Sequence, residues 1–213
     1  MANEKILILE AWADDISDTR AVRDFYASAE RLMSVSAPVR IIGRPLLANK
    51  YTDDVSAFLD LECNLRGPNI VIFSAHGGHE VKEANGRKIN KRTMTGHDGD
   101  INISTGIRRL NGRLERTIII LDSCKVGNNI GSFHDAAGAH CVVGFTTEVD
   151  WTDSAVFLLA LLMKLQENGI LHQQRLDVSR DGRLSSLEKV LQEMKSGQYR
   201  SLAEHLGFQY KLA

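Results

Sequence analysis

The sequence predicts the α/β fold class, in the form of a three-layer α/β/α sandwich with a mostly parallel central sheet. Two observations support this prediction. Short runs rich in isoleucine and valine recur along the chain, and each has the length and composition of a buried strand. Segments with the helical spacing of apolar residues lie between these runs. Because strand and helix alternate, we expect helices on both faces of the sheet and functional groups in loops at the carboxyl ends of its strands.

The elements follow one another along the chain. The strands are expected at Lys5–Leu9, Val39–Ile42, Asn69–Ser74, Thr117–Leu121 and Cys141–Phe145. The helices are expected at about Thr19–Met33, Thr52–Leu65, Asp100–Leu110 and Asp153–Gln166. The segment Glu80 to Lys91 has Asn85-Gly86 at its centre, which predicts a hairpin turn just after the third strand.

The composition is that of a globular protein without special partners. The 213 residues are 43% hydrophobic and 25% charged, and we expect residues 1–172 to form the main domain and residues 173–213 a helical extension packed on it. The net charge of −1 argues against binding to nucleic acid or to a membrane surface. No signal peptide and no apolar run of about 18 residues is present, so a cytoplasmic location is expected. Three cysteines without a CxxC pair suit a reducing compartment.

A histidine and a cysteine follow two of the predicted strands. His76 comes directly after the third strand, in the segment His76-Gly77-Gly78, and Cys124 follows the fourth. If these strands are adjacent and parallel, both side chains emerge at the same edge of the sheet. There an imidazole can take the proton from a thiol, so that the thiolate attacks a carbonyl, and can later give that proton to the leaving amine. The amides of Gly77 and Cys124 are candidate donors to the oxyanion.

These two motifs resemble the signature of caspases, metacaspases, separase, gingipains and bacterial CHAT-domain proteases. His76 and Cys124 are 124 − 76 = 48 residues apart, close to the roughly 50 residues typical of caspases. The likeness covers about residues 5 to 170. It implies a caspase-like fold and a cysteine-type endopeptidase, a hydrolase with Cys124 as nucleophile and His76 as acid and base, which requires no cofactor for its chemistry.

The resemblance also suggests a substrate pocket. Asp122 stands two residues before the cysteine, where caspases have glutamine, which resembles metacaspases and implies cleavage after Arg or Lys. Asp14 and Asp15 are candidates for a second acid in this pocket, although they would serve equally as a solvated loop that caps the following helix. Asp150 and Trp151 are candidates for another wall of the groove. Trp151 would also fit a core position at the start of a helix.

The segment from Asp177 to Glu188 fits the twelve-residue calcium loop. The candidate ligands are Asp177, Ser179, Asp181, Arg183 and Glu188. Bound calcium would order the C-terminal helices rather than take part in the chemistry, because thiol catalysis needs no metal. The alternative is a capping box in which Ser185 and Glu188 begin a helix that runs to Met194.

By resemblance we expect a protein substrate, with an activating partner or a small-molecule signal as trigger, and a role in bacterial stress or antiviral defence. Basic residues where self-cleavage could occur are Lys125, Arg87, Lys88, Lys91 and Arg92. Two other classes remain open: a catalytically silent binding or scaffold domain of the same fold, and a flavodoxin-like nucleotide binder. The second lacks sequence support, since neither GxGxxG nor GxxxxGK[ST] follows any strand.

Overall fold

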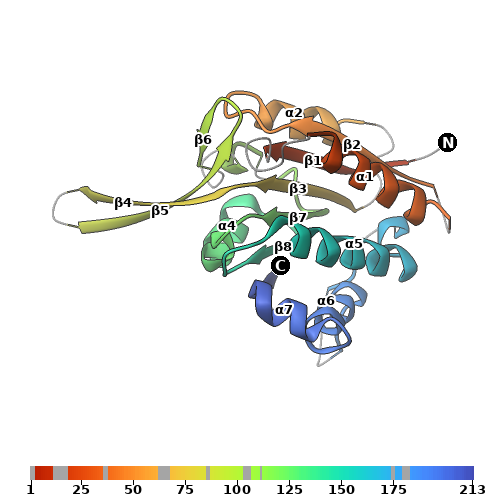
Figure 1. The fold of residues 1–213 in the computed structure, drawn as a ribbon. Helices are drawn as coiled ribbons and strands as arrows, with labels where there is room; N and C mark the ends of the chain where they lie inside the picture. The colour runs from red at the N-terminus through yellow and green to blue at the C-terminus, as the bar shows by residue number, and fades with distance from the viewer. Residues whose placement is uncertain are drawn as a thin grey trace.

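The computed structural model describes residues 3–11, 19–35, 38–61, 68–84, 87–102, 107–110, 112–173, 176–178 and 183–213. Its central sheet has six strands in the order β2-β1-β3-β7-β8-β9 (Figure 1). These strands are β1 (Asn3–Ala11), β2 (Val39–Pro45), β3 (Asn69–Ala75), β7 (Thr117–Asp122), β8 (Cys141–Phe145) and β9 (Phe208–Leu212). Neighbouring strands from β2 to β8 are parallel, and β9 is antiparallel to β8. The mostly parallel sheet and its five expected strands are confirmed, and β9 is an addition that the sequence analysis missed.

Helices cover both faces of this sheet. One face carries α1 (Thr19–Met33), α5 (Trp151–Glu167), α6 (Ser186–Ser196) and α7 (Arg200–Leu206), and the other carries α2 (Tyr51–Leu59) and α4 (Ile130–Ala137). Successive residues of a strand point to opposite faces, so Ile120 belongs to the core on the side of α5 while Leu121 belongs to the core on the side of α4. The three-layer arrangement is therefore confirmed. Among the described helices, none is long and apolar enough to cross a membrane.

A hairpin leaves the sheet directly after β3. It consists of β4 (Gly77–Ala84) and β5 (Arg87–Gly96), with the short strand β6 (Gly99–Ile101) beside β5, and it projects from the body of the protein in Figure 1. The expected hairpin is confirmed, although its turn residues 85 and 86 lie outside the described part. Its strands are longer than the expected segment.

Two predicted helices differ from the structure. The helix expected over Asp100–Leu110 is wrong at its start, where Asp100 and Ile101 belong to β6. Ile107 is helical and is followed by the 3-10 helix η2 (Arg108–Leu110), and residues 103–106 lie outside the described part. Ile101 pairs with Met94 of β5 and is buried there, so strand pairing overrides the local helical pattern. The helix expected to run to Leu65 ends at Leu59 in the structure.

Candidate active site

The cysteine motif lies on a sharp turn at the carboxyl end of β7. The strand ends at Asp122, and the 3-10 helix η3 (Val126–Asn129) begins two residues after Cys124. Between them Lys125 has a φ of 58°, the one positive φ of a non-glycine residue in the described part of the chain. A left-handed residue at this point reverses the chain within a few residues. The turn therefore presents Cys124 at the edge of the sheet instead of within a strand.

The turn is pressed closely against the next strand. A Cβ added to Gly127 would lie 2.7 Å from both the amide nitrogen and the carbonyl oxygen of Phe145, so only glycine allows this approach. The side-chain amide of Asn128 donates to the carbonyl of Lys125 at 3.1 Å and to that of Thr146 at 3.2 Å. These contacts fix the backbone on the carboxyl side of the cysteine.

The histidine motif lies at the adjacent strand end. β3 and β7 are neighbours in the sheet and parallel, with Ser74 in register with Asp122. His76 stands between β3 and β4, and its carbonyl accepts the amide of Thr95 at 2.9 Å. The histidine and the cysteine thus follow adjacent parallel strands, as the prediction required.

Gly77 brings the two motifs into direct contact. A Cβ added to Gly77 would lie 2.1 Å from the carbonyl oxygen of Cys124 and 2.7 Å from the Oγ of Ser123. The backbone next to His76 is therefore packed against the backbone of Cys124 itself. Both His76 and Cys124 are half-buried, which leaves each side chain partly open to solvent.

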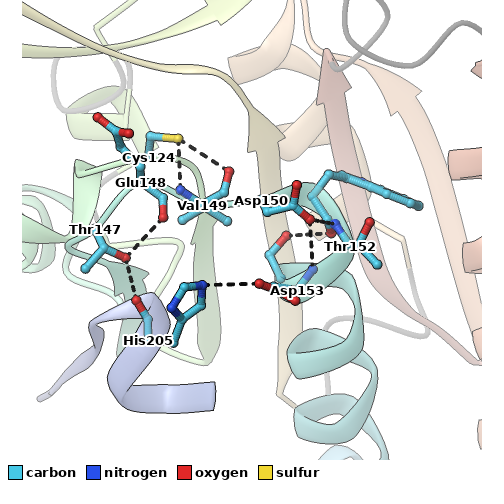
Figure 2. A network of polar contacts seen from close by, with 10 residues as sticks. Cys124, Thr147, Glu148, Val149, Asp150, Thr152, Asp153 and His205 are labelled. Atoms are coloured by element: carbon cyan, nitrogen blue, oxygen red, sulfur yellow. Dashed lines mark hydrogen bonds and ion pairs between the residues drawn. The ribbon is translucent and has the colours of Figure 1, made fainter. Parts of the chain in front are cut away.

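The sulfur of Cys124 is held by the loop that follows β8. The amide of Val149 donates to Sγ at 3.2 Å, and Sγ lies 3.7 Å from the carbonyl oxygen of the same residue, which it can reach as a thiol donor (Figure 2). An N–H group aimed at a sulfur stabilises negative charge on it, and the thiolate is the nucleophilic form. The sequence analysis missed Val149, because a backbone contact carries no side-chain signal.

The other cysteines do not compete for this role in the described part. Cys141 lies within β8 and is completely buried, and burial raises the pKa of its thiol far above the usual range. A buried thiol of this kind is unreactive. Cys63 lies outside the described residues.

Asp122 is buried near Tyr26 of α1 and Ser154 of α5 rather than open to solvent. Its side chain is 1% exposed, and its Oδ2 accepts the hydroxyl of Ser74 at 2.5 Å. Oδ1 has no donor among the described residues, and the hydroxyl of neighbouring Ser154 donates to the carbonyl of Trp151 at 3.1 Å. Burial raises the pKa of Asp122 to about 6, while the hydroxyls of Ser74 and Ser154 oppose the rise. Asp122 also raises the pKa of nearby Tyr26, although burial of that phenol is the larger cause.

Two of the remaining pocket candidates lie at the start of α5, and two lie outside the described part. Asp14 and Asp15 lie outside the described residues. Asp150 is the N-cap of α5, because its Oδ1 accepts the amide of Thr152 at 2.8 Å. Trp151 is half-buried at the first position of α5 and packs edge-on against Phe25 of α1, with ring centroids 5.8 Å apart. Trp151 thus occupies the core position at the start of a helix that was the alternative to a pocket role. Contact of Asp150 or Trp151 with a substrate stays a prediction.

The calcium-loop candidates lie at the start of α6. Both carboxylate oxygens of Asp177 accept the amide of Ser186, at 3.1 and 3.0 Å, and Ser185 accepts the amide of Glu188 at 3.1 Å. Asp177 and Glu188 line one pocket of about 160 Å³. Arg183 is exposed, and Ser179 and Asp181 lie outside the described residues.

The described residues test the fit of this loop to calcium only in part. No cluster of three His, Cys, Asp or Glu side chains suited to a metal ion occurs in the described ranges. The carboxylate of Asp177 accepts hydrogen bonds from the start of α6, although a carboxylate oxygen keeps lone pairs for a second partner. Capping of α6 by Ser185 is confirmed, and calcium binding stays a prediction.

Replacing Ser185 by alanine removes the N-cap of α6. We expect Ser185→Ala to lower the free energy of unfolding by about 1 kcal/mol, because the amide of Glu188 loses its acceptor in a position where the serine is buried. Urea denaturation followed by circular dichroism measures the change. Ser201→Ala, at an exposed serine of α7, is the matched control and should leave the unfolding curve in place. Equal curves for the two variants would refute the capping role.

Among the comparisons with known proteins, only the search of solved structures finds matches. No family model matches the chain, and none of the curated proteins matches it. Among solved structures, the chain is similar to a secreted C11 cysteine protease from Bacteroides thetaiotaomicron, determined in complex with an irreversible peptide inhibitor. The TM-score is 0.48 and the sequence identity is 11%, over 89% of this chain and 57% of that protein. The chain therefore spans little more than half the length of that protease.

Proposed function

We propose that this chain is a cysteine endopeptidase of the caspase-like type, with Cys124 as nucleophile and His76 as acid and base. The observation that carries the proposal is the contact of Gly77 with the carbonyl of Cys124, which ties the histidine segment to the cysteine turn. The amide of Val149 on the sulfur adds support, because it favours the thiolate. The order of the sheet places both motifs at the carboxyl ends of neighbouring parallel strands, where open α/β sheets carry their functional groups.

The proposed reaction has two halves. The thiolate of Cys124 attacks the carbonyl carbon of a peptide bond, and the oxyanion accepts hydrogen bonds from the amides of Gly77 and Cys124. His76, carrying the thiol proton, transfers it to the leaving amine as the C–N bond breaks, which leaves a thioester on Cys124. His76 then takes a proton from water, the hydroxide attacks the thioester, and the acid product leaves as the thiol reforms.

We infer a preference for Arg or Lys before the scissile bond, based on Asp122. Its pKa of about 6 leaves the carboxylate ionised at neutral pH. An ionised carboxylate that is buried, with one oxygen lacking a donor in the described part of the chain, is stabilised by an incoming cation. Asp14 and Asp15 remain candidates for a second acid of this pocket.

The natural substrate that we propose is a protein, since the resemblance is to endopeptidases. The same resemblance leads us to propose a partner or a small-molecule signal as trigger, and a role in bacterial stress or antiviral defence. A cytoplasmic location and calcium binding by the Asp177–Glu188 loop also remain proposals.

The test is turnover of fluorogenic peptides that carry Arg, Lys or Asp before the scissile bond, with and without calcium. The native chain should cleave the Arg or Lys peptides, and Cys124→Ala and His76→Ala should each reduce turnover by at least about 1,000-fold. Cys141→Ala is the matched control at a buried thiol and should keep native turnover.

The outcomes separate the parts of the proposal. Cleavage of the Asp peptide alone would preserve the role of Cys124 and refute that of Asp122. Turnover that survives Cys124→Ala would refute the nucleophile. Silence of the native chain on every peptide, with calcium and with candidate partners present, would favour the catalytically silent scaffold.

A further inference from the structure

The loop after β8, residues Thr146 to Val149, is the support of the Cys124 sulfur. On its inner side, the amide of Val149 contacts Sγ, and the carbonyl of Thr147 accepts the amide of Lys125 at 2.9 Å. A third tie is the ion pair between Lys125 and Glu148 at 2.6 Å. The position of this loop therefore decides whether the Val149 amide points at the sulfur.

The outer side of the same loop rests on the end of α7 and its C-cap Gly207, residues His205 to Gly207, which we call the His205–Gly207 turn. Thr146 contacts the carbonyl of Gly207 twice, through its amide at 3.1 Å and its hydroxyl at 3.1 Å. The hydroxyl of Thr147 reaches the carbonyl of His205 at 3.0 Å, slightly closer than the carbonyl of Glu148 at 3.2 Å (Figure 2). The loop is thus held between the cysteine turn and the C-terminal part of the chain.

The shape of the His205–Gly207 turn depends on Gly207. Its φ is +61°, and an added Cβ would lie 2.2 Å from the Oγ1 of Thr146 and 3.0 Å from the Cγ2 of Thr147. Only glycine combines this conformation with this approach. The turn is anchored a second time at His205, whose Nε2 lies 3.2 Å from the Oδ2 of Asp153 at the start of α5.

We propose that the His205–Gly207 turn is a positioning element for the thiol of Cys124, with Thr146 and Thr147 as the positioning residues. This inference deepens the proposed function and rests on it for its biological meaning. The contacts run from the carbonyls of His205 and Gly207, through the threonine hydroxyls and the loop backbone, to the Val149 amide on the sulfur. A ligand or partner that moves α7 would change the reactivity of the thiol without touching the active site.

The test measures the reactivity of the thiol directly and needs no substrate. The full chain is alkylated with iodoacetamide between pH 5 and 9, and mass spectrometry gives the rate at Cys124. We expect Thr147→Val to lower the rate at pH 7 about threefold and to move the midpoint of the profile upward by about 0.5 pH unit, because the Val149 amide is less well aligned with the thiolate. Thr146→Val should act in the same direction, and the double variant should exceed either single change.

Three controls make the result specific. Thr147→Ser keeps the hydroxyl and should restore the native profile, and Thr52→Val makes the same substitution in distant α2 and should have no effect. All variants retain His205 and Asp153, so the contact between these side chains is common to every sample. Thermal melts show whether each variant is folded at the temperature used, and the single variants decide the question if the double variant is not.

Native profiles for both Thr147→Val and Thr146→Val would overturn the proposal. So would a loss in Thr147→Val that Thr147→Ser does not restore, because a hydroxyl at position 147 would then not be enough to position the loop. Failure of the proposed function has a different signature: the expected alkylation shifts would be found in a chain that cleaves no peptide.

Discussion

Gly77→Ala is expected to reduce peptide turnover by at least about 100-fold, the loss that follows when catalytic groups are displaced by about 1 Å. The new Cβ would lie 2.1 Å from the carbonyl oxygen of Cys124 and 2.7 Å from the Oγ of Ser123, so the two segments must separate. The carbonyl belongs to the backbone of a turn fixed by Gly127 and Asn128, and it cannot rotate away as a flexible side chain would. The measurement is kcat/KM on the best basic peptide.

Gly131 provides the matched control. It lies in α4, and a Cβ added there meets no atom within 4 Å. Gly131→Ala should therefore keep native turnover and raise the free energy of unfolding by about 0.5–1 kcal/mol, the usual gain from alanine over glycine within a helix. If Gly77→Ala retained native kcat/KM, the contact between the two motifs would not matter for catalysis, and the main support of the proposed function would be lost.

The second large effect is expected from Asp122→Asn, which should stabilise the protein at pH 8 while it removes cleavage after Arg and Lys. Burial raises the pKa of Asp122 from 3.8 to about 6, so the folded protein holds this proton more tightly than the unfolded chain does. The stability that the carboxyl group contributes is therefore fully present below pH 4 and is lost as the pH rises through 6. The loss is about 3 kcal/mol by the relation between pKa and free energy.

Asparagine avoids this loss because it does not ionise, and it can still accept the hydroxyl of Ser74. Urea denaturation at pH 4, 6 and 8 should show a gap between variant and native protein that opens as the pH rises. Asp24→Asn, at an exposed residue of α1, is the control and should show no such gap. On Arg and Lys peptides, kcat/KM of Asp122→Asn should fall about 100-fold, since the substrate cation loses its partner. A variant that kept this activity would exclude Asp122 from the specificity pocket.

The sequence predicts the parallel strands well and misses the antiparallel edge strand β9. β3 and β7 are buried on both faces, so each contains a continuous run of apolar residues, mainly Ile, Val and Leu, that is recognisable without the rest of the fold. β9 reads Phe-Gln-Tyr-Lys-Leu and has partly exposed residues, and it is a strand because β8 is available to pair with it. A five-residue edge strand of mixed polarity has no such local signature.

The candidate site divides in the same way. Its motifs can be located from the sequence, because chain order and strand ends place His76 and Cys124 at adjacent strand ends. The groups that support these motifs cannot be located from the sequence. They are the amide of Val149 and the carbonyl of Gly207, and almost every residue has the same backbone groups. The burial of Asp122 also depends on which helix covers the end of β7, which is a property of tertiary packing.

The late position of β9 has a consequence for a chain that is still being synthesised. Residues 208–212 pair with β8, and the carbonyl of Gly207 holds Thr146, yet all of these C-terminal residues are translated after every other strand of the sheet. A ribosome-bound chain can assemble β1 to β8 and still lack the support for its thiol. If the proposed function is correct, we expect such nascent chains to be inert until the α7–β9 segment has left the ribosome.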